Sequence, residues 1–213
     1  MKSYLIRPAA ALALALALAS CGGGDDDKFT VQGSVTGLEY PSLVLQNNGG
    51  PALTVNPPAK AGDAVSFTFP EKIEYGDVYT VTFKDPPHQN CGPSSAGPNS
   101  LSDTAGRLSN INVLIACERD AYPVGGTLTG LTKDTTGLVL ANGSNTGTYT
   151  PTTEAITADK PFEYSLPVQV RYGDTYSVVV ITQPVGRFCT VANPAGVMGD
   201  EQIKNVNVTC VPR

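Results

Sequence analysis

Few residues of this 213-residue chain could carry out nucleophilic or acid–base chemistry, because it has one histidine and only 15% charged residues. A serine or cysteine nucleophile needs a base nearby. His88, the single imidazole, lies in an apparent loop, and no catalytic motif surrounds any serine. Glu71, Glu74 and Asp77 cluster, but on a predicted hairpin with nothing to bury them, whereas a glycosidase needs two carboxylates positioned in a cleft. We expect no catalytic residue and no enzymatic activity.

The tripeptide Tyr-Gly-Asp occurs at Tyr75 and again at Tyr172, which invites a catalytic interpretation of Asp77 and Asp174. Turn chemistry explains the motif better. Glycine tolerates positive φ angles, and an aspartate side chain accepts hydrogen bonds from nearby backbone amides. The motif therefore predicts two equivalent tight turns between strands.

Metal, cofactor and nucleic-acid binding are not expected from the composition. One histidine excludes a histidine-rich metal site, and no glycine-rich phosphate loop follows a strand into a helix. The acidic triplet Asp25–Asp27 follows Gly22–Gly24 without the spacing of a calcium loop, which favours a hydrated tether. The net charge of −5 provides no basic field for phosphates.

The first 20 residues are typical of an export signal. Lys2 and Arg7 precede an apolar run of Ala and Leu that is too short to span a bilayer. The run ends in Leu18-Ala-Ser-Cys21, which resembles a bacterial lipobox. That resemblance implies a signal peptide over 1–20, a diacylglycerol thioether and an N-acyl chain on Cys21, and a tether over 21–28. The expected location is the cell envelope, attached to the membrane by lipid. Gly22 after the cysteine resembles lipoproteins of the outer membrane.

The remainder of the chain is one unit written twice, over 29–120 and 121–213. The segment that begins at Val31 (VQGSVTGL) recurs at Val124 (VGGTLTGL), and Tyr75-Gly-Asp-Val-Tyr recurs at Tyr172. Cys91 and Cys117 match Cys189 and Cys210. We therefore expect two domains of about 90 residues, joined at 121–123.

Each copy contains short β-rich runs separated by Gly, Pro, Asn and Asp, and neither shows helical periodicity. The strand at 79–83 alternates so that Tyr79, Val81 and Phe83 face the core. Six or seven strands in each copy predict an all-β protein of two tandem β-sandwiches, immunoglobulin-like or transthyretin-like. The predicted strands are 29–35, 42–46, 52–56, 64–69, 78–84, 111–117, 124–129, 137–141, 146–150, 161–166, 175–182, 187–192 and 204–210.

The cysteine count divides into one lipid site and two matched pairs. With Cys21 lipidated, four cysteines remain and allow three connectivities. Each copy must be able to fold from its own sequence, so the duplication selects Cys91–Cys117 and Cys189–Cys210. An oxidising, exported location lets such bridges persist.

The copies differ most between their cysteines, where 91–103 of the first copy is longer and more polar than 189–196 of the second. This loop is interpreted as a tolerated insertion, with a binding loop as the alternative. Saccharide binding and strand addition at a sheet edge stay open, although the chain has no Trp and few aromatics.

The second copy resembles a bacterial repeat of secreted and outer-surface proteins, many of them predicted lipoproteins. The resemblance lies in the Gly-Leu-Val-Leu-Ala-Asn-Gly segment at 137–143, in Gln183-Pro184, in 189–193 (CTVAN), and in the Val-Asn-Val-Thr-Cys segment at 206–210. It implies a β-sandwich surface module and no catalytic residue. The expected function is a non-enzymatic envelope protein, either a spacer or a module that binds a protein or a polysaccharide. The alternative is a carbohydrate-binding module that works beside a separate enzyme.

Overall fold

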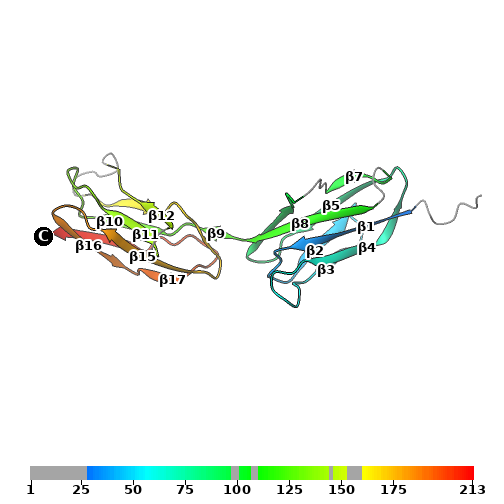
Figure 1. Ribbon diagram of the computed structural model, residues 1–213, viewed down its shortest axis with the longest axis horizontal. Coiled ribbons are helices and arrows are strands. Elements are labelled where there is room, and N and C mark those ends of the chain that lie inside the picture. The colour runs from blue at the N-terminus through cyan, green and yellow to red at the C-terminus, as the bar shows by residue number, and fades with distance from the viewer. Residues whose placement is uncertain (1–27, 97–100, 107–109, 144–145, 153–159) are drawn as a thin grey trace, which may run out of the picture.

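The computed structural model describes residues 28–96, 101–106, 110–143, 146–152 and 160–213. All regular secondary structure in these ranges is β, which confirms the all-β prediction. Figure 1 shows two sandwiches arranged end to end, with β1 beginning at one end and the C-terminus at the other. Each sandwich has its own cluster of buried apolar side chains. The predicted signal peptide and Cys21 lie outside the described residues.

The N-terminal sandwich packs two four-stranded sheets, with the strand orders β4-β1-β8-β6 and β3-β2-β5-β7. The central pair, β1 and β8, is parallel, and the other pairs are antiparallel. The strands are β1 (Lys28–Thr36), β2 (Leu43–Asn47), β3 (Leu53–Val55), β4 (Val65–Glu74), β5 (Val78–Lys84), β6 (Gln89–Pro93), β7 (Ser102–Thr104) and β8 (Ile111–Arg119).

The C-terminal sandwich repeats this topology strand for strand, as β13-β10-β18-β16 and β12-β11-β15-β17. A two-stranded ladder, β9 with β14, joins the linker to the second sandwich. The strands are β9 (Ala121–Tyr122), β10 (Gly125–Thr129), β11 (Val139–Asn142), β12 (Thr146–Tyr149), β13 (Phe162–Ser165), β14 (Val170–Arg171), β15 (Thr175–Thr182), β16 (Arg187–Ala192), β17 (Ala195–Val197) and β18 (Asn207–Pro212).

The order of neighbours differs from that of the immunoglobulin fold, in which the first two strands lie side by side in one sheet. Here β1 and β2 belong to opposite sheets, and β1 pairs with β4 and β8. Because β1 is central in its sheet, its apolar residues Val31 and Val35 are completely buried. Alternation along β5 buries Tyr79 and Val81 and places Phe83 against the same core, as predicted.

The sequence patterns missed the shortest and most polar strands. β6, β7, β9, β14 and β17 were not predicted, and β9 lies in the segment expected to be the linker. Each has two to five residues, so alternation has too few positions to be visible. Their partners are remote in sequence, as in the pairing of β6 with β8.

One glycine in each copy is required by the close approach of the parallel strands. A Cβ on Gly33 would lie 1.9 Å from the carbonyl oxygen of Val113. A Cβ on Gly126, at the same position of the second copy, would lie 2.1 Å from that of Val206. No side chain fits at either distance, so the glycine repeated in both sequence segments is a packing requirement of this fold.

Candidate functional site

Both predicted disulfides are present, and each joins two neighbouring strands. Cys91–Cys117 links β6 to β8, and Cys189–Cys210 links β16 to β18, with the two cysteines of each pair directly opposite in the ladder. All four cysteines are buried. Each bridge therefore fastens an edge strand to a central strand, which is a structural role.

A side chain before a proline covers the outer edge at each bridge. In the second copy, the Gln183 amide nitrogen donates to the Cys189 carbonyl at 3.0 Å, and the Cys189 amide donates to the Gln183 side-chain oxygen at 2.7 Å. In the first copy, the Cys91 amide donates to Asp85 at 3.0 Å. These bonds occupy backbone groups that an edge strand would otherwise offer to another chain.

The two Tyr-Gly-Asp segments form turns, as predicted, with φ angles of 89° at Gly76 and 79° at Gly173. In the first turn, Asp77 accepts a hydrogen bond of 2.9 Å from the Glu74 amide. Asp174 has an additional role, because it accepts a 2.7 Å hydrogen bond from Arg119 of the other sandwich. One motif therefore serves as a simple turn in one copy and as an intramolecular contact in the other.

Arg119 is the centre of the junction between the sandwiches. Its guanidinium also donates to the Tyr172 carbonyl at 2.9 Å and lies 3.4 Å from a Glu39 oxygen. The hydrogen bond to Asp174 is the main reason that the pKa of Arg119 is raised above its ordinary value. The backbone carbonyl of Asp120 extends the junction by accepting a hydrogen bond of 2.7 Å from the Tyr172 amide.

His88 belongs to the same junction. Its ring stacks on the Tyr172 ring, with centroids 3.8 Å apart and an angle of 4° between the planes. Tyr40 packs edge-on against both rings. The imidazole Nδ1 lies 2.6 Å from the Asp200 carboxylate. Ring stacking, the contact between His88 and Asp200, and the β9–β14 ladder therefore act together between the sandwiches.

A hollow of 230 Å³ opens on the C-terminal sandwich where its parallel ladder is interrupted. In the first copy, β1 and β8 form six consecutive pairs from Val31 to Thr36, whereas β10 and β18 form two. Gly125 donates to the Ile203 carbonyl and accepts from the Val206 amide, three residues further on. A regular parallel ladder would span two residues there, so one extra residue bulges out.

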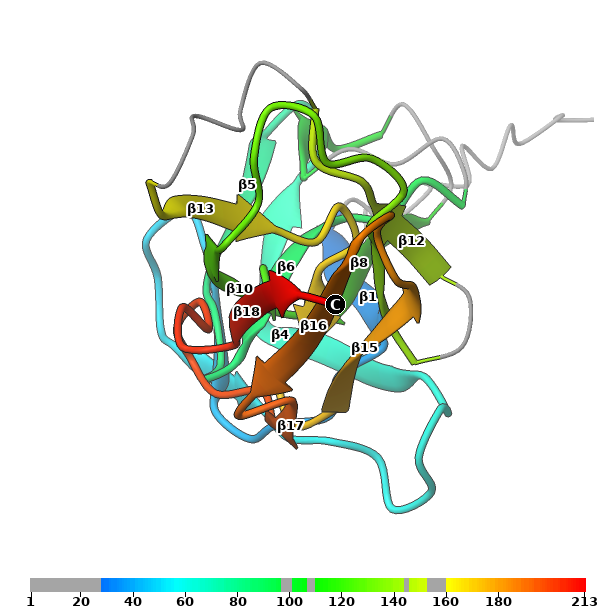
Figure 2. The ribbon, with the colours of Figure 1, turned by 90° about the vertical axis from the view of Figure 1, so that its left-hand side faces the viewer.

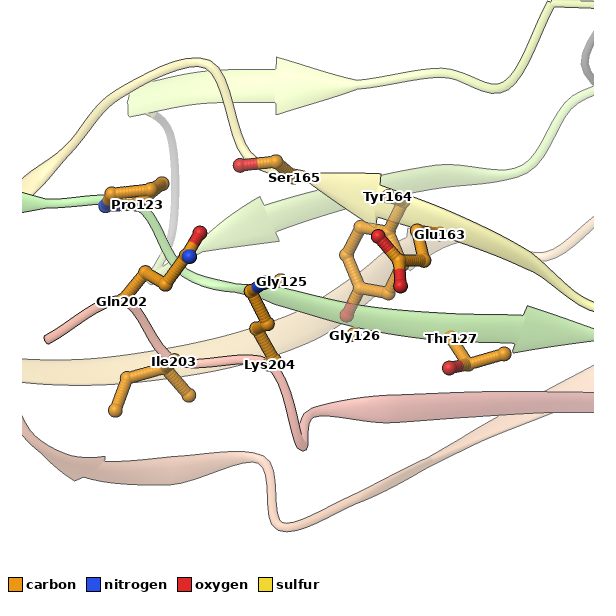
Figure 3. Close-up of a pocket in the computed structure, with 10 residues that line it drawn as sticks. All are labelled: Pro123, Gly125, Gly126, Thr127, Glu163, Tyr164, Ser165, Gln202, Ile203 and Lys204. Carbon is orange, nitrogen blue, oxygen red and sulfur yellow. The ribbon is translucent and has the colours of Figure 1, made fainter.

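The bulge places polar side chains around the hollow (Figure 3). Lys204 extends across β10 beside Gly125, and Glu163 comes from β13. Glu163 and Lys204 make no ion pair with any described residue. The remaining polar lining is Thr127, Ser165 and Gln202. This set can hydrogen-bond a polyhydroxylated or charged group.

Tyr164 forms the floor of the hollow and is not available to a ligand. Its hydroxyl donates to the Val206 carbonyl at 2.8 Å, and the residue is buried. Burial strongly raises the pKa of this phenol, and the neighbouring Tyr149 raises it further. Tyr164 therefore remains a neutral structural donor and not an acid–base group.

A second hollow, of 410 Å³, lies over β6 and β8 beside the linker. Its floor contains Gly92 and Ala116, and its polar side chains include Asn90 and Glu118. Arg119 also lines it but is held by the junction.

The candidates for chemistry do not come together in a cleft. Glu71 and Glu74 are exposed on β4, and Asp77 is exposed in its turn. Among the described residues, no group of three or more His, Cys, Asp or Glu side chains could hold a metal ion. Within the same ranges, no helix is long and apolar enough to cross a membrane. The 91–103 loop is described except for 97–100, and its two ends form β6 and β7.

The chain matches no protein-family model and no curated protein.

Proposed function

We propose that this chain is a non-enzymatic, lipid-anchored protein of the cell envelope that acts as a stiff spacer and carries a binding surface away from the membrane. The support for this proposal is the junction. Sandwiches joined by a short linker are expected to move relative to each other unless further contacts hold them. Here the Arg119, His88 and Tyr172 contacts act together with the β9–β14 ladder.

The anchor rests on the sequence around Cys21. Two acyl signals on one cysteine suffice for stable membrane attachment. The segment 22–27 lies between that cysteine and Lys28, the first residue of β1. The membrane would lie near the β1 end, and β16 and β18 would project at the far end (Figure 1).

Small-angle X-ray scattering tests the spacer. The exported chain with Cys21→Ser, which prevents lipidation, is compared with the same chain carrying Arg119→Ala and His88→Ala. We expect a single extended particle for the first, and for the second a broader distribution of intramolecular distances with an unchanged β-sheet circular dichroism spectrum. Identical scattering from the two proteins would show that the junction does not set the geometry.

Labelling cells with a radioactive or clickable fatty acid tests the anchor separately. We expect the label on the wild-type chain and none on the Cys21→Ser variant. Equal labelling of both would exclude Cys21 as the lipid site.

The alternative, a carbohydrate-binding module that works beside a separate enzyme, draws its support from the polar hollow between Glu163 and Lys204. It shares the anchor and the spacer with the first proposal.

A further inference from the structure

The outer face of the sheet β13-β10-β18-β16 carries a continuous series of hydrogen-bonding side chains. The hollow lies at the end of this face nearest the junction, with Thr127 and Glu163 at its border. Further along, Thr129, Thr209 and Thr190 lie opposite one another on three adjacent strands. Thr190 and Thr209 are exposed, so their hydroxyls are accessible from solvent.

The same face ends in an exposed apolar pair at the tip of the molecule. Phe188 and Val211 are partners on β16 and β18, and they are 46% and 51% exposed. Val185, in the preceding turn, is 77% exposed. The Arg213 guanidinium lies 5.7 Å from the centroid of the Phe188 ring. Figure 2 shows β16 and β18 side by side near the C-terminus in the end-on view.

The duplicated sandwich shows that the fold does not require this apolar pair. Asn90 and Glu118 are partners on β6 and β8 at the positions that Phe188 and Val211 occupy on β16 and β18. One copy therefore has a polar pair where the other exposes an aromatic ring and a valine. Exposed aromatic residues are characteristic of binding sites, so this difference marks the tip of the second copy as a candidate binding surface.

The face suits an extended polyhydroxylated chain better than a peptide strand. A peptide adds to a sheet through the backbone of a free edge. At β16, the outward backbone groups of Cys189 are already occupied, because its carbonyl accepts from the Gln183 side chain and its amide donates to that side chain. The hollow is smaller than the 300–1,000 Å³ of typical small-molecule pockets, so it suits one unit of a polymer that continues along the sheet.

We propose that the C-terminal sandwich binds a polysaccharide along this outer face. One sugar unit occupies the hollow and hydrogen-bonds to Glu163 and Lys204. The following units lie over the threonine row, and a ring packs on Phe188. This assignment deepens the interaction-module part of the proposed function and rests on it. The lipid anchor and the stiff junction stand independently of it.

Charge favours a polymer that carries carboxylates. Lys204 lies at one end of the face and Arg213 at the other, and Glu163 is the single acidic side chain among the face residues named above. A uronic-acid polymer offers both carboxylates for the two cations and hydroxyls for Glu163 and the threonines.

Affinity electrophoresis in native gels tests the proposal with the Cys21→Ser chain. The gels contain polygalacturonate as the acidic polymer, hydroxyethyl cellulose as the neutral polymer, or no polymer. The variant Glu163→Ser with Lys204→Ala empties the hollow of charge. Serine is the residue that the first copy has at the matching position, because Ser66 pairs with Ser34 as Glu163 pairs with Thr127. A second variant, Phe188→Asn with Val211→Glu, gives the tip the residues of the first copy.

We expect polygalacturonate to retard the unmodified chain more than the neutral polymer does. The hollow variant should raise the apparent dissociation constant about tenfold or more, as expected for the loss of charged hydrogen bonds. The tip variant should weaken binding several-fold. The matched control, Asn90→Ala with Glu118→Ala on the other sandwich, should bind as the unmodified chain does.

Absence of retardation by both polymers would overturn the saccharide assignment and leave the anchored spacer untouched. Unchanged binding by the hollow variant, or weaker binding by the control, would place the polymer elsewhere, for example in the hollow over β6 and β8. Concentration-dependent dimerisation in sedimentation, abolished by the tip variant, would instead assign Phe188 and Val211 to contact with a second copy.

Discussion

Removal of the Arg119 side chain should uncouple the two sandwiches, and the duplicated turn provides the control. Arg119 donates to Asp174 and to the Tyr172 carbonyl, at 2.7 and 2.9 Å. A hydrogen bond to a charged group contributes about 1.5–3 kcal/mol when it is shielded from water. The Arg119 side chain is 22% exposed and that of Asp174 is 46% exposed, so solvent screening lowers the contribution of their pair to about 1 kcal/mol.

A double-mutant cycle of Arg119→Ala and Asp174→Ala measures this coupling in urea unfolding experiments. We expect a coupling energy of about 1 kcal/mol that decreases in high salt, because part of it is an ion pair at a partly exposed site. Asp77→Ala is the control, since Asp77 makes the turn contact and pairs with no arginine in the described part of the chain. It should cost only the hydrogen bond to the Glu74 amide, about 0.5–1.5 kcal/mol.

A coupling energy of zero at low salt would refute this reasoning, because Asp174 would then act only within its own turn. Equal losses of stability in Asp77→Ala and in Asp174→Ala would lead to the same conclusion. Scattering data on the single variants would show whether the energetic coupling also fixes the geometry.

Three further outcomes are expected. Replacing Cys189 and Cys210 by alanine should lower the free energy of unfolding by about 3.3 kcal/mol from the loop of 21 residues alone, as measured by urea unfolding, and a loss below about 1 kcal/mol would contradict the entropic account. Gln183→Ala should destabilise more than Asp85→Ala, because it removes two hydrogen bonds to a cysteine backbone instead of one; thermal unfolding of both variants checks the order. Burial raises the pKa of Tyr164 in the folded protein, so the unfolded chain loses this phenol proton at a lower pH than the folded protein does. The contribution of Tyr164 to the free energy of unfolding should therefore be fully present below about pH 10. Above that pH it should fall by up to about 1.4 kcal/mol per pH unit. Tyr164→Phe should make the decrease of the urea unfolding midpoint above pH 10 less steep. An unchanged dependence of the midpoint on pH in this variant would contradict the role assigned to Tyr164.

Much of the fold could be predicted because its determinants are local or are written twice. The alternation of Tyr79, Val81 and Phe83 predicted the inward face of β5, and the structure confirms it. The matched cysteines predicted both disulfides, since the duplication left one economical pairing. The Tyr-Gly-Asp repeats predicted turns because the glycine conformation and the aspartate cap act within four residues.

The candidate site was less accessible to sequence reasoning. The strand predicted at 204–210 begins at Asn207, because the segment that contains Lys204 does not pair in the parallel ladder between β10 and β18. Nothing local to Lys204 signals that bulge, which depends on a partner strand about 80 residues earlier. Comparison of the copies held one usable signal, since Gly125 of the second copy stands where the first has Gln32. Arg119 was not identified as a junction residue, because its partners lie 53 and 55 residues away.

The sequence by itself therefore determined the fold class, the duplication, the cysteine pairing and the turns, all of which depend on short-range geometry or on internal repetition. Only the tertiary structure decided that the same Tyr-Gly-Asp turn holds the junction in one copy and meets solvent in the other. It also decided that the parallel ladder between β1 and β8 is continuous, whereas its duplicate between β10 and β18 is interrupted by a bulge beside a hollow. Both differences arise where strands or sandwiches remote in sequence meet, and the energy of such contacts depends on distances that a residue pattern does not contain.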